Sequence, residues 1–529
     1  MEQSPFFNED HELFRQSVRQ FVDAEVKPHA DEWERNQRIP RHVWQRMGEL
    51  GFLGINHPEA YGGSNNDFFY SVVLLEECAR SGLAGFAAAH SVHQYMSTAH
   101  LAKAGSEALK LRYLPGAING NLWGSLAVSE PGAGSDVANI RTTAKREGDH
   151  YIINGQKTFI TNGVYGDFVT VAVKTDPNAG PAGISLILVD QGTPGFTTRK
   201  LEKMGWHSSD TGELFFDNVK VPASNLVGKE GQGFYYIMES FQLERLVGGI
   251  AACEGAQLVL DTTLKYIRER EAFGKKLQKF QTIRHTLSDL ATEIEACRAL
   301  VYQTSWKFDK GIFAVKECSM VKLLGTELGK KAADVCLQYF GGYGYMESFP
   351  MARMYRDARV GTIVGGASEI MREIISKVVI DGISYESAYK AMKAQADEPA
   401  PTTENISEPI SVKTQNNKTM AAPETAKEII QSLPTRLKKE KAEGIETKFH
   451  FEITGERGGN FTVHVTEQTV VVTEGHNGEA NCVVTTTDVV YEDTELGRIN
   501  PQMAVMMGKI KISNLGEMMK FVGLFSRLS

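Results

Sequence analysis

Hydrophobic residues follow a helical period at the beginning of the chain. From Leu13 to Val22 they recur every three or four positions, the spacing that gathers side chains on one face of a helix. Gly51 and the glycine pair at 62–63 interrupt this pattern, and such glycines commonly separate helices. The pattern therefore predicts an α-helical domain over residues 1–121.

The pattern changes between residues 122 and 232. Short runs rich in β-branched and aromatic residues alternate there with Gly, Pro, Asn and Asp turns, which is typical of strands. A β domain is therefore predicted for residues 122–232. Helical periodicity returns afterwards and predicts a second α-helical domain over residues 233–390. The clearest strand-like runs are residues 151–153, 168–173, 184–189 and 213–216.

A shift in composition marks the end of the helical part. Residues 391–423 are rich in Pro, Thr, Asn, Glu and Ser, so they cannot bury enough apolar surface to fold and are predicted to be a flexible linker. Residues 424–529 then show a helix and four alternating strands, which predict a small α+β domain. Methionines are more often core than binding surface, although they suit both. The methionine-rich helical segments lie around Met503, Met506 and Met507 and around Met518, Met519 and Phe521.

The overall charge and the cysteine spacing exclude several classes of function. The 529 residues carry a formal net charge of −8, whereas a protein that binds nucleic acid needs a basic surface. None of the six cysteines forms a C-x-x-C pair, so neither a metal site nor a disulfide framework is expected. No hydrophobic run is long enough for a membrane span. Since no signal, transit or peroxisomal S-K-L segment is seen, a cytoplasmic enzyme is expected.

One carboxylate stands out within the long helical pattern that begins at residue 233. Glu244 lies in the string S-F-Q-L-E-R-L among mostly hydrophobic positions, where scarce water raises the pKa of a carboxyl group toward that of a useful general base. The alternative is a structural carboxylate held in an ion pair. The residues three or four positions away are not basic, and the adjacent Arg245 does not share its face. A basic partner from another segment is not excluded, so both interpretations stay open at this point.

Two strings in the β segment have the composition of ligand-binding turns. Residues 126–136 read L-A-V-S-E-P-G-A-G-S-D, and residues 154–163 read N-G-Q-K-T-F-I-T-N-G. The first is not a Rossmann fingerprint, because Val137 stands where the third glycine is needed. Its glycines and hydroxyls suit a cofactor or a phosphate, but a plain turn has the same composition. The aromatic Phe159 of the second string, taken alone, is better explained by a place in the core.

Together the two strings resemble the acyl-CoA dehydrogenase family, and the resemblance extends over residues 8–385. Three further strings match in order: R-E-x-F-G-K at 270–275, Q-x-F-G-G-x-G at 338–344 and Y-R-D-A-R at 355–359. The resemblance implies a multi-domain α and β fold, with a helical domain, a barrel-like β domain and a helical bundle in succession. It also implies FAD, α,β-dehydrogenation of a fatty acyl-CoA to the trans-2-enoyl-CoA, and an electron-transfer flavoprotein as electron acceptor. The shared cofactor site of the family implies a homo-oligomer, usually a tetramer.

The resemblance also assigns roles to individual residues. Ser135 is expected to contact the acyl-CoA, and Gln242 and Arg245 are expected to bind substrate beside Glu244. Ala367 stands where threonine is common in the family, which weakens the expected FAD contact at that position. Two groups of residues are expected to hold FAD. The β segment contributes Leu126, Val128, Ser129, Phe159 and Thr161. The group expected to reach FAD across a subunit contact is Arg270, Phe273, Gln281, Gln338 and Gly342, and Glu369 follows in the last motif.

The expected base departs from the commonest family pattern. Many members carry the catalytic glutamate in a Y-E-G-T string, but residues 364–367 read V-G-G-A here, so Gly365 offers no side chain. Long-chain and isovaleryl types place the glutamate instead in an L-E-R-L-like string on the earlier helix, which residues 243–246 match. The resemblance therefore makes Glu244 the expected catalytic base. A backbone N–H near Gly365 is expected to polarise the thioester oxygen.

Residues 424–529 resemble the sterol carrier protein 2 family. The matching strings are A-N-C-V-V-T-T at 480–486, R-I-N-P-Q-M-A at 498–504 and G-K-I-K-I at 508–512. The resemblance implies a small sheet with helices around an apolar tunnel for a lipid or acyl chain. Two other functions stay open: a lipid carrier whose dehydrogenase part is only a scaffold, and an acyl-CoA oxidase that uses oxygen. The sequence does not reveal the acyl chain length or whether the thioester is on coenzyme A or a carrier protein.

Overall fold

Two compact units make up the described part of the chain. The computed structural model describes residues 4–387, 390, 423, 425–439, 442, 444–466, 468–496, 498, 504–505 and 509–526. The first unit comprises Met1–Pro177 and Gly183–Tyr389, and the second is formed mainly by Lys390–Ser529. Two predicted features lie outside the described residues: the linker at 391–423, apart from Pro423, and the segment around Met503, Met506 and Met507.

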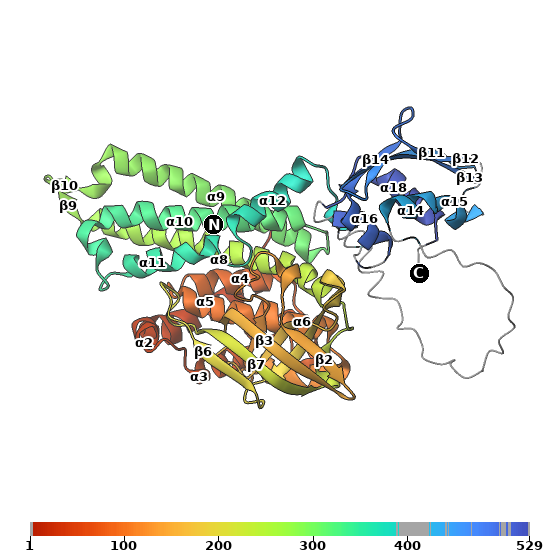
Figure 1. The fold of residues 1–529 in the computed structure, drawn as a ribbon. Coiled ribbons are helices and arrows are strands. Elements are labelled where there is room, and N and C mark those ends of the chain that lie inside the picture. The colour runs from red at the N-terminus through yellow and green to blue at the C-terminus, as the bar shows by residue number, and fades with distance from the viewer. Residues whose placement is uncertain are drawn as a thin grey trace. The chain divides into compact units, whose positions relative to one another are not determined.

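The first unit begins with a layer of helices, as the hydrophobic period predicts (Figure 1). Helix α1 starts at a capping box, in which Asn8 and His11 each accept a hydrogen bond from the other's backbone N–H. Such reciprocal bonds satisfy free amides of the first turn. Helix α4 is buried along most of its length and forms the centre of the layer. The helices are α1 (Glu9–Phe21), α2 (Ala30–Asn36), α3 (Arg41–Glu49), α4 (Phe68–Ala79), α5 (Ala84–Ser91), α6 (Thr98–Ala104) and α7 (Glu107–Ile118), with a π-helical segment η4 (Val92–Ser97).

A single eight-stranded sheet follows the helices. Its strand order is β6-β7-β3-β2-β4-β5-β8, with β1 paired in parallel to β4. Most of the other neighbours are antiparallel, which connects them through the short turns that the Gly and Pro positions predict. The β domain expected between two helical domains is confirmed. The strands are β1 (Gly124–Ala127), β2 (Thr143–Glu147), β3 (His150–Thr161), β4 (Phe168–Lys174), β5 (Ile184–Asp190), β6 (Phe196–Lys200), β7 (Thr211–Pro222) and β8 (Leu226–Val227).

In the second set of helices, α8 and α10 approach each other closely because glycines line their contact. A Cβ atom added to Gly249 would lie 2.4 Å from Cγ1 of Val321, and one added to Gly325 would lie 2.7 Å from the Gly249 carbonyl oxygen. Only glycine lets two backbones come so near. The close contact therefore fixes how residues of α8 and α10 near the crossing lie relative to each other. The elements are α8 (Gly233–Glu269), the hairpin β9 (Glu271–Ala272) and β10 (Lys275–Lys276), α9 (Gln281–Asp309), α10 (Val315–Phe340), α11 (Pro350–Arg359) and α12 (Ser368–Val379).

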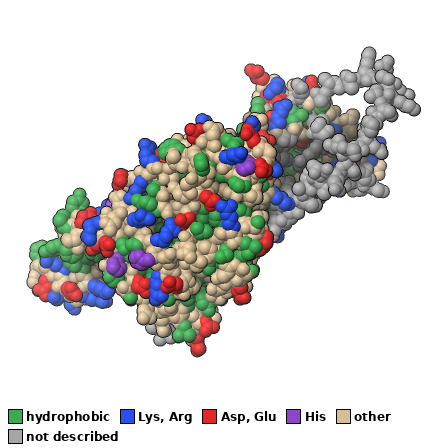
Figure 2. All heavy atoms as spheres, turned by 90° about the horizontal axis from the view of Figure 1, so that it is seen from below, with side chains coloured by type: hydrophobic (Ala, Val, Ile, Leu, Met, Phe, Trp, Pro, Cys, Tyr) green, Lys and Arg blue, Asp and Glu red, His purple; other side chains and the backbone are tan. Residues whose placement is uncertain are grey.

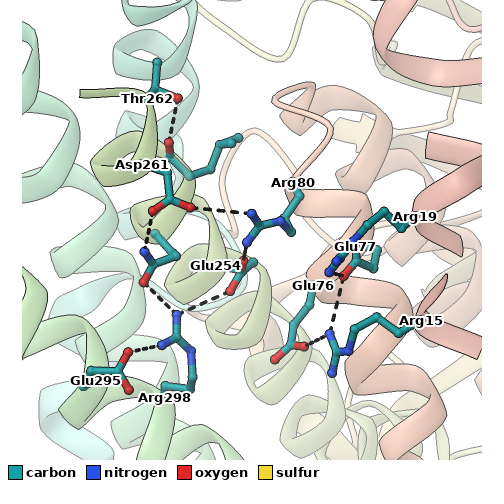
Figure 3. A network of polar contacts seen from close by, with 12 residues as sticks. Arg15, Arg19, Glu76, Glu77, Arg80, Glu254, Asp261, Thr262, Glu295 and Arg298 are labelled. Carbon is teal, nitrogen blue, oxygen red and sulfur yellow. Dashed lines mark hydrogen bonds and ion pairs between the residues drawn. The ribbon is translucent and has the colours of Figure 1, made fainter. Parts of the chain in front are cut away.

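A buried network of ion pairs joins the two sets of helices (Figure 3). On α4, Glu76 accepts hydrogen bonds from Arg15 of α1 across 2.6 Å and from Tyr302 of α9 across 2.8 Å. Arg80, also on α4, donates to Glu254 of α8 across 2.5 Å. Since charged groups are costly to bury without partners, this network restricts how the two helical layers can pack.

Hydrophobic side chains gather on the surface at the end of the first unit that carries the β9–β10 hairpin (Figure 2). Phe273 at the hairpin tip is 94% exposed, and Tyr345 and Met346 in the segment after α10 are also exposed. Elsewhere on the face shown, basic and acidic side chains are interspersed. An exposed hydrophobic cluster of this kind is typical of an interaction surface.

The second unit is a small sheet packed against helices (Figure 1). Its strand order is β13-β12-β11-β14-β15, in which β11 and β14 are parallel. Aromatic rings fill the core, where Phe521 packs against Phe449 and Phe451, and Phe451 also meets Tyr491. The predicted α+β fold is confirmed. The elements are α14 (Ala426–Gln431), α15 (Leu433–Arg436), β11 (Glu446–Thr454), β12 (Gly459–Thr466), β13 (Thr469–Glu474), β14 (Cys482–Thr487), α16 (Asp488–Glu495), β15 (Lys511–Ile512) and α18 (Leu515–Leu524).

Candidate active site

Glu244 lies in the first third of α8 and is almost fully buried, with 8% of its surface exposed. Among the described residues, its Oε1 atom has no hydrogen-bond partner and no ion pair to it is formed. Burial raises the pKa of Glu244 to about 7, and the charge of Arg245 acts against this rise. The structural ion pair that the sequence left open is therefore not found in the described part of the chain. The carboxylate instead has a pKa suited to a general base near neutral pH.

The side chain one turn before Glu244 on α8 is an uncharged hydroxyl. One turn before Glu244, the hydroxyl of Ser240 lies 3.2 Å from Nδ1 of His100 on α6. Burial is the main cause that lowers the pKa of His100 to about 4, and Lys103 acts in the same direction. The ring is therefore neutral at pH 7. No sequence signal points to His100, because a lone histidine in a hydrophobic helix is more often a core residue.

The two residues expected to bind substrate beside Glu244 have different surroundings. The carboxamide oxygen of Gln242 accepts a hydrogen bond from the Ala314 N–H across 3.2 Å, so it fastens the start of α10 to α8. The Arg245 guanidinium is buried, lies 5.4 Å from the centre of the Phe241 ring and forms no ion pair within the described residues. Because a buried cation without a hydrogen-bonded countercharge is costly, Arg245 has the stronger case for a functional role.

A turn without side chains precedes α12. Gly365 and Gly366 both have left-handed backbone conformations, with φ of +62° and +94°. The ammonium of Lys322 on α10 donates to the Gly366 carbonyl across 2.5 Å, which holds the turn against the helical bundle. A Cβ atom added to Gly365 would meet no atom within 4 Å, so the space in front of this position is open.

The two glycine-rich strings of the β domain lie side by side. The Thr158 N–H donates to the Ser129 carbonyl across 3.0 Å, which joins the end of β1 to β3. Ala127 is buried in the core of the sheet, whereas Leu126, Val128 and Ser129 are only half-buried. Strand alternation thus turns Leu126 and Val128 to the side opposite Ala127. Val128 packs there against a second hydrophobic cluster, and both residues stay partly exposed together with Ser129.

Behind these strings, Lys157 and Glu130 form a buried ion pair. The Lys157 Nζ atom lies 2.8 Å from Oε1 of Glu130 and 3.0 Å from the Val128 carbonyl oxygen. Glu130 also accepts hydrogen bonds from the N–H groups of Arg141 and Thr142. Burial lowers the pKa of Lys157 to about 8, although Glu130 opposes the shift. The pair joins the first string to the second and is not among the predicted site residues.

Phe159 projects from the sheet at a β-bulge. The pairing of β3 with β7 shifts register between Lys157 and Ile160, and Phe159 has a left-handed backbone there, with φ of +62° and 71% of its surface exposed. An exposed aromatic residue in that conformation costs free energy, which indicates a surface shaped for a ligand. The core position that the residue type alone favours is wrong for Phe159. Thr161, two positions on, is half-buried.

Ser135 lies on an exposed loop beside a cleft of about 250 Å³. Its side chain is open to solvent but does not line the cleft. No motif marks Asn139 or Arg141, which the fold brings to the cleft from a neighbouring turn. The cleft is lined by Glu130, Pro131, Gly132, Asn139, Arg141, Thr142, Gly155 and Gln156.

The remaining predicted cofactor residues lie away from these strings. The Arg270 guanidinium lies 5.7 Å from the centre of the Tyr343 ring, which joins the end of α8 to the segment after α10. Figure 1 shows the β9–β10 hairpin at an end of the helical bundle far from the sheet. Within one chain the two groups of predicted cofactor residues are therefore separate. All members of the second group are exposed: Arg270, Phe273, Gln281, Gln338 and Gly342, and so is Glu369 on α12.

The described residues form neither a metal site nor a disulfide, and none of their helices suits a membrane span. No three His, Cys, Asp or Glu side chains among them converge on a metal site. All six cysteines are free and buried. Of the helices that the structure describes, none is long and apolar enough to cross a membrane.

Comparisons with known proteins identify relatives for both units. Three family models match the first unit in succession: the N-terminal domain of acyl-CoA dehydrogenase at residues 8–121, its middle domain at 125–219 and its C-terminal domain at 231–380. A model of the SCP-2 sterol transfer family matches residues 426–526.

Individual relatives match the first unit over nearly their whole length. The mitochondrial long-chain specific acyl-CoA dehydrogenase of Sus scrofa is 40% identical over 377 residues, which cover 71% of this chain and 87% of the relative. The mitochondrial isovaleryl-CoA dehydrogenase of Pongo abelii is 40% identical over 376 residues, which cover 70% of this chain and 88% of that protein. The crystal structure of an acyl-CoA dehydrogenase from Geobacillus kaustophilus has 46% sequence identity and a TM-score of 0.69, and the match covers 72% of this chain and 100% of that one.

Proposed function

Because the chain belongs to the acyl-CoA dehydrogenase family and carries an SCP-2 domain, we propose that Glu244 is the base of its reaction and FAD its cofactor. The enzyme dehydrogenates a fatty acyl-CoA between the α and β carbons to the trans-2-enoyl-CoA, and the SCP-2 domain is a tethered lipid-binding domain. One observation carries the assignment of the base: the Glu244 carboxylate is buried and unpaired among the described residues, with a pKa of about 7.

Glu244 removes the α-proton of the thioester in this proposal. A carboxylate with a pKa near 7 is a stronger base than an ordinary one and is still largely ionised slightly above neutral pH. The positive charge of Arg245 favours the ionised form and so keeps the base available despite burial. An acyl chain that enters the site displaces water, which raises the pKa of Glu244 further and strengthens it as a base.

The Gly365 N–H is the proposed donor to the thioester oxygen. As the α-proton leaves, negative charge moves onto that oxygen, and a fixed N–H donor stabilises the charge as it develops. The open space in front of Gly365 leaves room for the thioester. Arg245 contributes a buried positive charge on the same side of α8 as α10, and Ser135 contacts the acyl-CoA from its exposed loop.

The β-domain surface fits a flat aromatic cofactor with polar edges. Leu126 and Val128 present half-buried apolar side chains, Ser129 adds a hydroxyl, and Phe159 extends an exposed ring. We assign these residues and Thr161 to FAD, which supplies the acceptor for the hydride from Cβ when it is bound. A glutaryl-CoA dehydrogenase from Mycobacterium smegmatis, 28% identical with a TM-score of 0.68, was solved in complex with FADH2, which supports the assignment.

We also propose a homo-oligomer, specifically a tetramer, and the separation of the two cofactor groups supports a site shared between subunits. The β9–β10 hairpin, which Arg270 directly precedes, lies far from the sheet of its own chain (Figure 1), so this group would complete the FAD site of a neighbouring subunit. The exposed hydrophobic cluster at the hairpin supports such a contact. We further propose an electron-transfer flavoprotein as electron acceptor and a cytoplasmic location.

Anaerobic flavin bleaching tests the proposed function. The purified full-length protein is mixed with straight acyl-CoAs of increasing length and with branched ones, and at least one should remove the yellow flavin absorbance. Glu244→Gln should bind the same thioester without bleaching. A protein purified without FAD would contradict the cofactor, and hydrogen peroxide formed in air at the turnover rate would identify an oxidase instead. A flavin that no thioester bleaches would identify a non-catalytic scaffold.

A further inference from the structure

Lys322 is a buried cation that, among the described residues, donates its hydrogen bond to a backbone carbonyl. It lies on α10 with 3% of its surface exposed, and its Nζ atom donates to the Gly366 carbonyl across 2.5 Å. No Asp or Glu of the described residues forms an ion pair with it. Burial lowers the pKa of Lys322 to about 8, Arg245 lowers it further, and Glu327 and Glu369 oppose the shift from a distance. Burying a lysine in such surroundings costs folding free energy, so we look for a functional role of Lys322.

The close crossing of α8 and α10 determines where Lys322 sits. Gly325, at the crossing, follows Lys322 by three residues, and Gly249 follows Arg245 by four. Both cations are thus one helical turn before the point where the backbones touch. The crossing brings the two positive charges near each other, since Arg245 acts on Lys322 as well as on the adjacent Glu244.

We propose that Lys322 is a positioning residue, which holds the Gly366 carbonyl and thereby aims the Gly365 N–H at the thioester oxygen of the substrate. This inference rests on the proposed function of the same site. The turn consists of two glycines in left-handed conformations, so it has no side chain of its own to lock it. The Lys322 ammonium supplies that lock.

Binding of a 3-thia-acyl-CoA separates this role from a structural one. In this analogue a sulfur atom replaces Cβ, so Glu244 can remove the α-proton but no hydride can follow. The anion formed next to the oxidised flavin of the holoenzyme gives a long-wavelength charge-transfer band, and its pH titration reports how strongly the site acidifies the α-carbon. Lys322→Met should raise the apparent pKa of the bound analogue by about one unit, a tenfold loss of acidification.

The kinetic signature should differ from that of a binding defect. Lys322→Met should slow flavin reduction by a true substrate about 10- to 100-fold, as expected when a polarising donor is misplaced, with a much smaller change in KM. FAD content and melting temperature should stay near those of the wild type. Lys322→Arg, which keeps the charge and a donor, should recover most of the effect. Lys330→Met, on the exposed face of the same helix, is the matched control and should behave as wild type.

The outcomes distinguish this inference from the proposed function. A Lys322→Met enzyme with the wild-type analogue titration and reduction rate overturns the inference alone. A wild-type protein whose flavin no acyl-CoA reduces overturns the proposed function. If Lys322→Met does not fold, Lys322→Gln is compared with Lys322→Arg. A bound-analogue pKa that is raised in Lys322→Gln but not in Lys322→Arg supports the inference. Equal, unshifted pKa values in both variants overturn it.

Discussion

Lys157 and Glu130 form an ion pair inside the β domain, with 2.8 Å between Nζ and Oε1 and with side chains that are 0% and 7% exposed. Through its bond to the Val128 carbonyl, Lys157 also ties β3 to the strand end that presents Leu126 and Ser129. The buried Lys157–Glu130 pair therefore stabilises the strand ends that form the surface assigned to FAD, in addition to the hydrophobic packing of the sheet.

Lys157→Met should lower both the FAD content and the stability of the enzyme. The substitution leaves the Glu130 carboxylate buried without its countercharge, which costs about 3–5 kcal/mol. The measurements are the flavin-to-protein ratio after gel filtration and the melting temperature. Lys145→Met is the control, because Lys145 pairs with Glu147 on an exposed edge, where a pair contributes about 1 kcal/mol or less. Full flavin content in the Lys157 variant would contradict the link between this pair and the cofactor strings.

The pH dependence of flavin reduction should report the ionisation of Glu244. Burial raises its pKa to about 7, and only the ionised form can accept a proton. The reduction rate should therefore rise about tenfold per pH unit below 7 and level off above it. Rapid mixing at limiting acyl-CoA, where the rate reports the ionisation of the free enzyme, measures this profile. Glu244→Gln should lower the rate by about 10²- to 10⁴-fold and abolish the inflection; an inflection that survives in this variant belongs to another group.

A carboxylate at Gly365 should rescue part of the activity that Glu244→Gln removes. A Cβ atom added to Gly365 has no neighbour within 4 Å, so the start of a new side chain is accommodated. Its φ of +62° is nevertheless a left-handed conformation that costs an L-residue about 1–2 kcal/mol. We expect the double variant with Gly365→Glu to reduce flavin faster than Glu244→Gln but to melt at a lower temperature. Gly365→Ala in the same background carries the strain without the carboxylate, and equal rates in the two double variants would refute a shared proton.

The sequence was sufficient to predict features that depend on local pattern. The hydrophobic period of α8 was enough to predict hydrophobic surroundings for Glu244, but it left a structural ion pair open, and only the fold shows a buried carboxylate without one among the described residues. Phe159 shows the limit of this reasoning. Its exposure results from a register shift between β3 and β7, and no property of the string N-G-Q-K-T-F-I-T reveals the partner strand that causes the bulge.

Buried lysines were missed for a related reason. Lys157 meets Glu130 across 27 sequence positions, and Lys322 meets Gly366 across 44. In the sequence each is a polar residue within an otherwise regular strand or helix, and such a residue is most often on the solvent side. Only the tertiary fold decides that both point inward. The sequence did not predict the close α8–α10 crossing either, because a glycine within a helical pattern more often indicates a weak point of the helix than a close contact.

The ion-pair network between the helical layers should dominate the stability of the first unit. Glu76→Gln removes the carboxylate that Arg15 and Tyr302 share on α4. Because Arg15 keeps Glu12 at 3.4 Å and Glu77 at 3.5 Å, the stability should fall by about 1.5–3 kcal/mol, as for a lost hydrogen bond to a charged group. Calorimetry of the full chain measures the shift of the main transition. Glu293→Gln is the control, since the Lys331–Glu293 pair is exposed. Equal melting temperatures for the two variants would show that the network contributes little.

The last prediction concerns the second unit. Its aromatic core around Phe449 and Phe521 is formed by its own residues, and the composition of residues 396–423 predicts a flexible tether of roughly 28 residues with a root-mean-square reach of about 30 Å. Such a tether holds a lipid-binding domain at high effective concentration near an active-site mouth.

A chain that ends at Gln395 should therefore keep its flavin and oxidise short, soluble acyl-CoAs at the full rate. Its kcat/KM should fall selectively for long-chain substrates at low concentration, where free thioester is scarce, and residues 424–529 alone should bind a fluorescent fatty acyl probe. A full-length variant whose linker is replaced by Gly and Ser at equal length is the control and should match the wild type, because reach and not linker sequence is what the delivery requires. If the shortened enzyme equals the full chain on every substrate and the isolated tail binds no probe, the tail does not deliver substrate and is better explained as a docking or oligomerisation module.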